Sequence, residues 1–291
     1  MLHRSGPAGN GPGLDISLAF IFHGHRYGPA IPAGLGYATA LPVIRCMRNI
    51  RLHVAQPLVE GTEFPLPAQA GEHATRVLRL IAGDPLSLFN GDGCEYPAVI
   101  LAVGKREVMV RVQSRRVLHN ESPLSLTLAQ GVARGEKMDM IVQKATELGV
   151  ARIVPLLTER SEVKLDAARA GKRLAHWQAV AASACEQSGR ARLPEILPAL
   201  PLSAWLADLA DDGALRLALL PEATNSPREL RFGAAGGLLV IGPEGGIGDR
   251  DIGALTAAGF SGLRLGPRIL RTETAGLAAL AALQAMHGDF R

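Results

Sequence analysis

The sequence predicts an α/β fold, with a mostly parallel sheet flanked by helices in the C-terminal part and a small β-barrel domain before it. From residue 121 onward, strand patterns alternate with helical patterns, which is typical of a parallel sheet covered on both faces. Over residues 47–120, short strand patterns follow one another with Gly, Pro, Asp and Asn between them, as in a small all-β domain. The chain of 291 residues is 47% hydrophobic and 20% charged, so it can bury a core in each part.

Residues 1–46 lie before both predicted domains and contain many Gly and Pro residues without a sustained period. Their one apolar run, Leu14–Phe22, is interrupted by Asp15, and the order of regions that a signal peptide requires is absent. This segment is therefore either a disordered extension or the result of a translation start assigned upstream of the true start codon. Met47, which a strand pattern follows directly, favours the second interpretation.

The bulk composition limits the partners and the compartment. Three cysteines, Cys46, Cys94 and Cys185, have no metal-ligand spacing, which argues against a metal site and favours a reducing cytoplasm. The apolar runs are too short to span a membrane. The net charge is +4, yet residues 121–291 hold nineteen basic and nineteen acidic residues, so bulk charge supports nucleic-acid binding only weakly.

The predicted β domain contains four strand patterns and one helix. The strands cover IRLHV (50–54), PLSLFN (85–90), EYPAVILAV (95–103) and EVMVRVQSRRV (107–117). The segment Asn90-Gly91-Asp92-Gly93 predicts a hairpin turn, because Asn and Gly tolerate the positive φ of such turns. A helix is expected at about Gly71–Leu80.

The predicted α/β domain begins with the strand LSLTLAQGV (124–132), which leads to a helix over Glu136–Leu148. Apolar residues recur along one face of that helix, namely Met138, Ile141, Val142, Ala145 and Leu148. The strand ARIVPLL (151–157) then precedes a long helix over Ala167–Ser188, which Gly189 ends. Further strands are LRLALL (215–220), GLLVIG (237–242) and GLRLG (262–266), and helices follow the last two.

The strand at 237–242 runs straight into a turn, Gly242-Pro243-Glu244-Gly245-Gly246. Ligands of α/β sheets bind at the carboxyl ends of strands, where glycine lets the backbone approach a ligand closely. Asp249 is then expected to cap a helix that runs to Ala258. A tight strand-to-helix connection has the same signature. Neither a phosphate-binding P-loop nor a dinucleotide-binding G-x-G-x-x-G after a strand occurs in the sequence.

A second loop, LGPRILRTETA (265–275), also leaves a strand and enters a helix. Thr272 or Thr274 is the expected cap, and Glu273 is favourable in the first helical turn. Two such loops that leave neighbouring strands can form two walls of one pocket.

These two loops together resemble the SPOUT superfamily of methyltransferases, and within it the family that modifies N3 of a uridine in 16S ribosomal RNA. The segments RVLRL (76–80), NGDG (90–93), KATELGV (144–150), TERS (158–161) and EQSGR (186–190) fit the same family. The resemblance covers the chain from about Met47 to its end. It implies a PUA-like RNA-binding domain over 47–120, a trefoil-knotted catalytic domain over 121–291, S-adenosylmethionine held in the knot, and a homodimer.

The resemblance also implies where the cofactor binds. Backbone atoms of both loops suit the adenine edge, leucine and isoleucine side chains can cover its faces, and the residues after LRLALL should form the remaining wall. The expected cofactor-binding residues are Pro221, Glu222, Ile241, Gly242, Pro243, Glu244, Gly245, Gly246, Leu265, Gly266, Arg268, Ile269, Leu270, Thr272, Thr274 and Ala275. For each leucine and isoleucine, plain core packing is an equally good interpretation.

Methylation of N3 requires that this nitrogen lose its proton, which calls for a general base or for cations that stabilise the negative charge on the uracil. We expect Arg160 or Arg271 to stabilise the anion and the phosphate, with Glu159 or Glu273 as base or orienting group. Surface or dimer salt bridges are the competing interpretation of these charges.

The expected RNA contacts are arginines, namely Arg76, Arg79, Arg111, Arg115, Arg116 and Arg190. Arg76 and Arg79 would share one helix face. Seven Phe, three Tyr and two Trp are too few to favour a stacking platform. Two alternatives stay open at this point. One is a 2′-O-ribose RNA methyltransferase of the same superfamily, and the other is a ribosome-assembly RNA-binding protein that has lost transfer.

Overall fold

The structure is a computed structural model that describes residues 50–105, 107–162 and 167–290. The expectations for residues 1–46 lie outside the described residues. Over the described part of the chain, the structure has no helix with the length and hydrophobicity that a membrane span requires.

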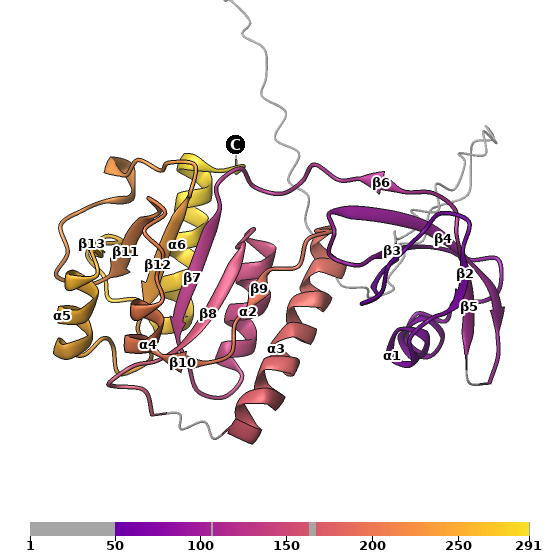
Figure 1. Ribbon diagram of the computed structural model, residues 1–291, viewed down its shortest axis with the longest axis horizontal. Helices are drawn as coiled ribbons and strands as arrows, with labels where there is room; N and C mark the ends of the chain where they lie inside the picture. The colour runs from indigo at the N-terminus through magenta and orange to yellow at the C-terminus, as the bar shows by residue number, and fades with distance from the viewer. Residues whose placement is uncertain (1–49, 106, 163–166, 291) are drawn as a thin grey trace, which may run out of the picture. The chain divides into compact units, whose positions relative to one another are not determined.

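The first domain is built on a six-stranded sheet with one short helix beside it (Figure 1). The strand order is β1-β3-β4-β5-β2, and β6 pairs with β4. Only the β1–β3 pair is parallel. The strands are β1 (Arg51–His53), β2 (Glu63–Pro65), β3 (Pro85–Phe89), β4 (Cys94–Val103), β5 (Val108–Val112) and β6 (Arg116–Val117). The first three predicted strand patterns are confirmed, but the pattern over 107–117 is divided into β5 and β6, which pair with different parts of β4. The strand β2 has three residues and is too short to show a period.

The predicted hairpin turn joins β3 and β4, which pair antiparallel. Gly91 and Gly93 have φ values of 96° and 88°, which side chains with a Cβ rarely adopt. Asp92 accepts a hydrogen bond from the Tyr96 hydroxyl at 2.7 Å. The turn therefore has the chemistry that its sequence predicts.

The predicted helix over Gly71–Leu80 is wrong in its bounds. The structure has α1 (Ala68–Glu72), followed by one π-helical turn, η1 (His73–Val77). The chain then leaves the helix, and Arg79 takes the left-handed region at φ 57°. This reversal lets the buried Leu80 reach the core. Arg76 and Arg79 therefore do not share a helix face.

The second domain contains a seven-stranded sheet in which every pair of strands is parallel. The order is β10-β8-β7-β12-β11-β13, with β9 beside β8. The strands are β7 (Leu126–Gly131), β8 (Arg152–Leu157), β9 (Glu195–Ile196), β10 (Leu200–Pro201), β11 (Leu215–Leu219), β12 (Gly237–Ile241) and β13 (Ser261–Leu263). The predicted parallel α/β sheet is confirmed; the two-residue strands β9 and β10 carry no sequence signal.

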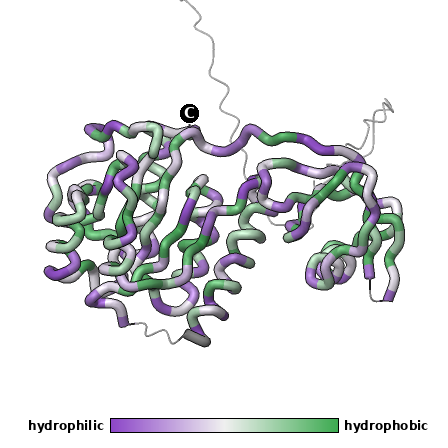
Figure 2. Tube along the Cα trace, in the orientation of Figure 1, coloured by the Kyte–Doolittle hydropathy of each residue, from purple (hydrophilic) through white to green (hydrophobic). Residues whose placement is uncertain are grey.

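Helices cover both faces of this sheet (Figure 1). They are α2 (Lys137–Glu147), α3 (Ala167–Ser188), α4 (Leu202–Ala207), α5 (Asp249–Ala257) and α6 (Thr272–His287), with a 3₁₀ turn η2 (Pro227–Glu229). Successive strand residues enter different cores: Leu128 packs in a cluster with residues of α2, α3 and α6, whereas Ala129 packs in a cluster with residues of α4 and α5. Figure 2 shows the resulting hydrophobic stretches along the strands. The sheet is thus a central layer between two helical layers.

The starts of α5 and α6 differ from the prediction. Gly248 is at the N-cap of α5 and Arg271 at the N-cap of α6, and neither helix has a side-chain cap. Asp249 and Thr272 are instead the first helical residues. The Thr272 hydroxyl is used elsewhere, because it donates to the carbonyl oxygen of Gly242 at 2.6 Å. The trefoil knot that the family resemblance implies stays a prediction.

Candidate functional site

A cavity of about 710 Å³ lies at the carboxyl edge of the parallel sheet, where β11, β12 and β13 end. Its walls come from the segments that follow these strands, with residues of 219–222, 241–247 and 263–275. The two predicted loops do not leave adjacent strands, because β11 lies between β12 and β13. Parallel strands all end at one edge, so the three segments still meet. A cavity of this size is in the range of small-molecule sites.

Packing around Gly242 explains the glycines of the first loop. A Cβ on Gly242 would lie 2.8 Å from the carbonyl carbon of Gly246 and 2.9 Å from Cγ1 of Ile247. Gly246 has φ 73°. The loop therefore folds back on itself in a way that only glycine permits at these positions.

Buried hydrogen bonds hold the two loops together. The amide of Gln130, at the end of β7, donates to the Thr272 hydroxyl at 2.9 Å, and Thr272 donates to the carbonyl oxygen of Gly242. Gln130 and Thr272 are both buried. The start of α6 is thus tied to the glycine loop, which makes this part of the cavity wall preformed.

One wall of the cavity is charged. Nζ of Lys137, the first residue of α2, lies 3.2 Å from Oε1 of Glu244 and 3.5 Å from Oε2 of Glu273. Partial burial raises the pKa of Glu244, but hydrogen bonds from backbone N–H groups, including that of Arg134, and from Lys137 outweigh it. The pKa of Glu244 therefore lies below its usual value, and the wall carries an ionised carboxylate beside an ammonium group.

Most of the predicted cofactor-binding residues line this cavity; the exceptions among the sixteen are Gly245 and Thr274. The carbonyl oxygen of Gly245 accepts a hydrogen bond from Arg160 at 3.3 Å, outside the cavity lining. Thr274 lies on another face of α6 and lines a second, smaller cavity. Pro221 and Glu222 do form the wall expected of them.

Three of the four predicted catalytic residues, Arg160, Arg271 and Glu273, line the cavity, but Glu159 does not. The backbone N–H of Glu159 donates to Asp251 at 2.8 Å, at the start of α5. The placement therefore favours Glu273 over Glu159 as a group that reaches a substrate.

Seven lining residues are absent from the prediction. They are Lys137, Leu219, Leu220, Ile247, Ile252, Leu263 and Arg264. Lys137 begins the helix that follows β7, so the rule that ligands lie at the carboxyl ends of strands, applied to β7 as well, would have found it.

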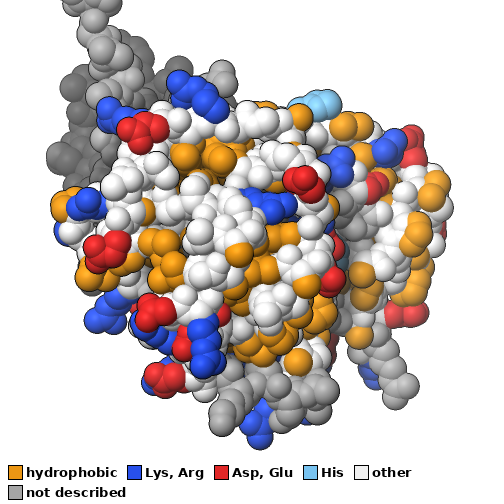
Figure 3. Space-filling model, turned by 60° about the vertical axis from the view of Figure 1, so that its left-hand side comes forward, with side chains coloured by type: hydrophobic (Ala, Val, Ile, Leu, Met, Phe, Trp, Pro, Cys, Tyr) orange, Lys and Arg blue, Asp and Glu red, His pale blue; other side chains and the backbone are white. Residues whose placement is uncertain are grey.

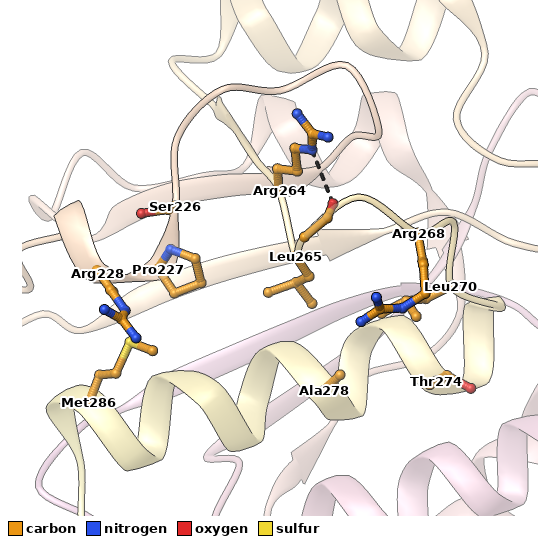
Figure 4. A pocket seen from close by; sticks show the side chains of 11 residues that line it. Ser226, Pro227, Arg228, Arg264, Leu265, Arg268, Leu270, Thr274, Ala278 and Met286 are labelled. Atoms are coloured by element: carbon orange, nitrogen blue, oxygen red, sulfur yellow. Dashed lines mark hydrogen bonds between the residues drawn. The ribbon is translucent and has the colours of Figure 1, made fainter.

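The second cavity, of about 480 Å³, lies between the Ser226–Arg228 turn, the loop after β13 and α6 (Figure 4). Leu265 points toward α6, and Met286 stands at the far end of that helix beside Arg228. Arg264 is held by a hydrogen bond from Nε to the carbonyl oxygen of Gly266 at 3.0 Å. This cavity shares Leu265, Leu270 and three further residues with the larger one.

The predicted RNA-contacting arginines of the first domain, Arg76, Arg79, Arg111, Arg115 and Arg116, are all exposed. Arg76 pairs with Glu72 at 3.3 Å and Arg111 with Glu63 at 2.6 Å. Because these are exposed surface pairs, they are weak and leave both guanidinium groups accessible.

Arg190 does not belong to an RNA-binding surface. Its side chain is buried, and it donates to the Glu121 carboxylate and to the carbonyl oxygens of Thr146 and Val150 at 2.7 to 3.2 Å. Its own carbonyl oxygen accepts a hydrogen bond from Arg51 of β1. The guanidinium is thus bound within the second domain, and the contact to the first domain is made by the Arg190 carbonyl oxygen.

We expect Arg190→Ala to lower the free energy of unfolding by about 3 kcal/mol, because it removes one partner of a buried ion pair and leaves Glu121 and two carbonyl groups unpaired. Chemical denaturation followed by circular dichroism measures this change. Arg111→Ala is the matched control, and its exposed pair should change stability by less than about 1 kcal/mol. An Arg190→Ala protein of wild-type stability with weakened RNA binding would restore the original assignment.

The comparisons with known proteins cover both domains. The family model described as an RNA methyltransferase domain matches residues 120–284, and one described as an RNA methyltransferase PUA domain matches residues 66–113. The chain is 34% identical over 239 residues to "Ribosomal RNA small subunit methyltransferase E" of Buchnera aphidicola (from Schizaphis graminum), which covers 82% of this chain and 97% of the relative. The protein of the same name from Bacillus subtilis is 32% identical over 236 residues, 78% of this chain and 92% of the relative.

Two solved structures have the same fold. The small subunit methyltransferase E of Neisseria gonorrhoeae, solved bound to S-adenosyl methionine, is 36% identical with a TM-score of 0.77, and the match covers 83% of this chain and 99% of that one. A Legionella pneumophila protein, solved in complex with the cofactor SAM, is 41% identical with a TM-score of 0.80 and the same coverage. Both structures match this chain over the β domain and the α/β domain together.

Proposed function

The chain belongs to the family of ribosomal RNA small subunit methyltransferase E, and from this premise we propose that it transfers a methyl group from S-adenosylmethionine to N3 of a uridine in 16S rRNA. It acts on the small ribosomal subunit in the cytoplasm. The observation that carries the proposal is the 710 Å³ cavity, in which the segments after β11, β12 and β13 converge.

The cavity fits the proposed cofactor chemically. Its apolar side chains, which include Leu219, Ile241 and Leu270, suit the faces of an adenine ring. The space over Gly242 is already filled by its own loop, so backbone groups rather than a side chain line this wall. Among the described residues, Oε2 of Glu273 is buried without a hydrogen-bond partner and lies 3.5 Å from Nζ of Lys137. The site thus offers apolar walls and, at Glu273, a carboxylate for a polar ligand.

When bound, S-adenosylmethionine supplies a sulfonium methyl group whose departure leaves a neutral thioether. The residues that would hold it are those of the Gly242–Gly246 loop, the Leu265–Leu270 loop and the Pro221–Glu222 segment that line the cavity. The charged groups at Lys137, Glu273 and the arginines remain for the nucleotide.

The chain's own residues then account for the nucleobase chemistry. Arg271 lines the cavity and is exposed, so its guanidinium can approach the oxygens of the uracil, where negative charge develops. Arg160 lines the same cavity and donates to the first loop. Fixed cations at such a position stabilise the developing charge without reorganisation. Glu273 supplies an acceptor for the proton of N3.

The function is tested by incubating the purified protein with methyl-labelled S-adenosylmethionine and small subunits that lack the modification, followed by mass-spectrometric mapping. We expect one labelled uridine in 16S rRNA, with the methyl on the base. A label on a ribose would identify a 2′-O enzyme, and cofactor binding without any label in rRNA would indicate a non-catalytic RNA-binding protein.

A homodimer is part of this proposal, and α6 supports it. One face of α6 is buried against the sheet, with Ala279, Leu280 and Leu283 fully covered, while the other carries Ala278 and Met286 at the second cavity. A helix that is apolar on both faces is normally buried on both. In Figure 3, which brings the side of α5, β11 and β13 forward, hydrophobic side chains gather in the middle with charged ones around them. We propose that a second copy of the chain packs against this face of α6.

We expect Met286→Glu to weaken this dimer by about 100-fold or more, because the substitution would bury a carboxylate in an apolar interface. Sedimentation equilibrium over a concentration series measures the change. Met140→Glu, at an equally exposed methionine of α2, is the control and should sediment as the wild type does. A monomeric wild type, or a Met286→Glu variant that stays dimeric, would remove α6 from the interface.

A further inference from the structure

The junction of Lys137, Glu244 and Glu273 joins three segments that are far apart in the sequence. Lys137 begins α2, Glu244 lies in the first cavity loop, and Glu273 lies in the first turn of α6. Lys137 Nζ donates a hydrogen bond to Glu244 at 3.2 Å, while its distance to Glu273 Oε2 is 3.5 Å. One ammonium group therefore contacts a carboxylate from each of the two cavity loops.

The two carboxylates are not equivalent. Oε1 of Glu244 also accepts the backbone N–H of Arg134 at 3.1 Å, so that carboxylate is anchored on the protein. The Glu273 side chain is only 13% exposed, and its Oε2 has no hydrogen-bond partner among the described residues. A separation of 3.5 Å is an ion-pair contact rather than a hydrogen bond of good length. Among the described residues, Oε2 of Glu273 is therefore held by the Lys137 ion pair alone.

From this geometry we infer that Lys137 is a positioning residue, which holds Oε2 of Glu273 and so fixes this carboxylate at the cavity, where the carboxylate receives the proton of uracil N3. The inference rests on the proposed function and adds to it a residue that the sequence motifs did not indicate. Glu244 anchors the ammonium on one side, and the position of Glu273 in the first turn of α6 favours its negative charge. Glu273 is then the catalytic residue, and Lys137 acts through it.

The chemical step balances with these groups alone. The N3–H bond breaks as its proton passes to the Glu273 carboxylate. The electron pair left on N3 forms the bond to the methyl carbon, whose bond to sulfur breaks with its electrons remaining on sulfur. Lys137 neither gains nor loses a proton. No further oxidant, reductant or metal is required.

The test compares Lys137→Met, Lys137→Arg, Glu273→Gln and the double variant Lys137→Met/Glu273→Gln with the wild type, on small subunits at saturating cofactor. We expect Lys137→Met and Glu273→Gln each to lower kcat by about 100-fold or more, as is typical for loss of a general base. The double variant should be no slower than Glu273→Gln, because residues that act as a unit are not additive. Lys137→Arg should restore at least a tenth of the wild-type kcat.

Calorimetry of cofactor binding supplies a second readout that does not depend on turnover. We expect all variants to bind S-adenosylmethionine within about threefold of the wild type. Lys144→Met, a pair-forming lysine of the same helix that does not line the cavity, is the matched control for both assays. The inference is overturned if Lys137→Met weakens cofactor binding but has the wild-type kcat at saturating cofactor. Lys137 would then only stabilise the arrangement of the two loops.

Full activity of Glu273→Gln, or losses of Lys137→Met and Glu273→Gln that multiply in the double variant, would also overturn it. Failure of the proposed function looks different, because the wild type itself would then place no methyl on a uracil of 16S rRNA. The product of the wild-type protein is therefore mapped before the variants are compared.

Discussion

Arg271→Ala should reduce methyl transfer by about 1,000-fold while leaving the cofactor dissociation constant within a few-fold of the wild type. Arg271 lines the cavity and its side chain is exposed, without an ion-pair or side-chain hydrogen-bond partner among the described residues. Truncation therefore leaves no protein group unpaired. What is lost is the stabilisation of the anionic uracil, and removal of one such fixed group typically costs 100- to 1,000-fold, about 3 to 4 kcal/mol.

Single-turnover transfer to small subunits measures the rate, and calorimetry measures cofactor affinity. The backbone of Arg271 begins α6 and its carbonyl oxygen accepts the N–H groups of Thr274 and Ala275, which alanine preserves. Arg250→Ala, an exposed arginine of α5 outside the cavity, controls for a general loss of positive charge. If Arg271→Ala keeps full activity, Arg271 has no part in the chemistry and Arg160 becomes the remaining candidate.

The second large effect is expected at Gly131, the last residue of β7. A Cβ placed there would lie 2.5 Å from both N and Cδ of Pro243, closer than two such atoms can approach. Because the neighbouring atoms include backbone, the Pro243 loop must move. We expect Gly131→Ala to lower the free energy of unfolding by about 2 kcal/mol, as overpacking of a filled core does. A distortion of the same size at the cavity wall would weaken cofactor binding by about 30-fold.

Thermal unfolding and cofactor calorimetry check both parts of this expectation. Gly253→Ala is the matched control, since a Cβ at Gly253 in α5 has no neighbour within 4 Å. Alanine in a helix interior is more favourable than glycine by about 1 kcal/mol, so this control should be slightly more stable and bind the cofactor normally. Wild-type cofactor affinity in Gly131→Ala would show that the Pro243 loop is not part of the binding wall.

Local patterns were enough to predict the main elements of the fold. The apolar stripe of α2 and the length of α3 could be read directly, because both helices must bury one face and Gly149 and Gly189 follow them. The start of α5 was misplaced by one residue, since capping depends on where a hydroxyl or carboxylate finds its best partner. Thr272 shows this most clearly: its hydroxyl bonds to Gly242, thirty residues away in the sequence, and not to its own helix.

The candidate site, too, was predicted only in part from the sequence. Glycine-rich strand ends predicted both loops, because ligands of α/β sheets bind at the carboxyl ends of strands. The family resemblance then implied most of the residues that line the cavity. Sequence spacing could not show that β11 lies between β12 and β13, nor that Lys137 reaches both loops. Arg79 and Arg190 were assigned from charge alone, and charge does not reveal a left-handed turn or a buried guanidinium.

By itself, then, the sequence determined the two-domain α/β organisation, the family and the two loops that line the cavity, since each of these depends on local periodicity or on residues that adjoin in the chain. The tertiary structure decided which charges meet. Glu273 lines the cavity and Glu159 does not, the buried Arg190 pairs with Glu121, and Lys137 contacts Glu244 and Glu273. Such contacts join residues that are far apart in the sequence, and only packing brings them within the few ångströms over which charge and hydrogen bonding act.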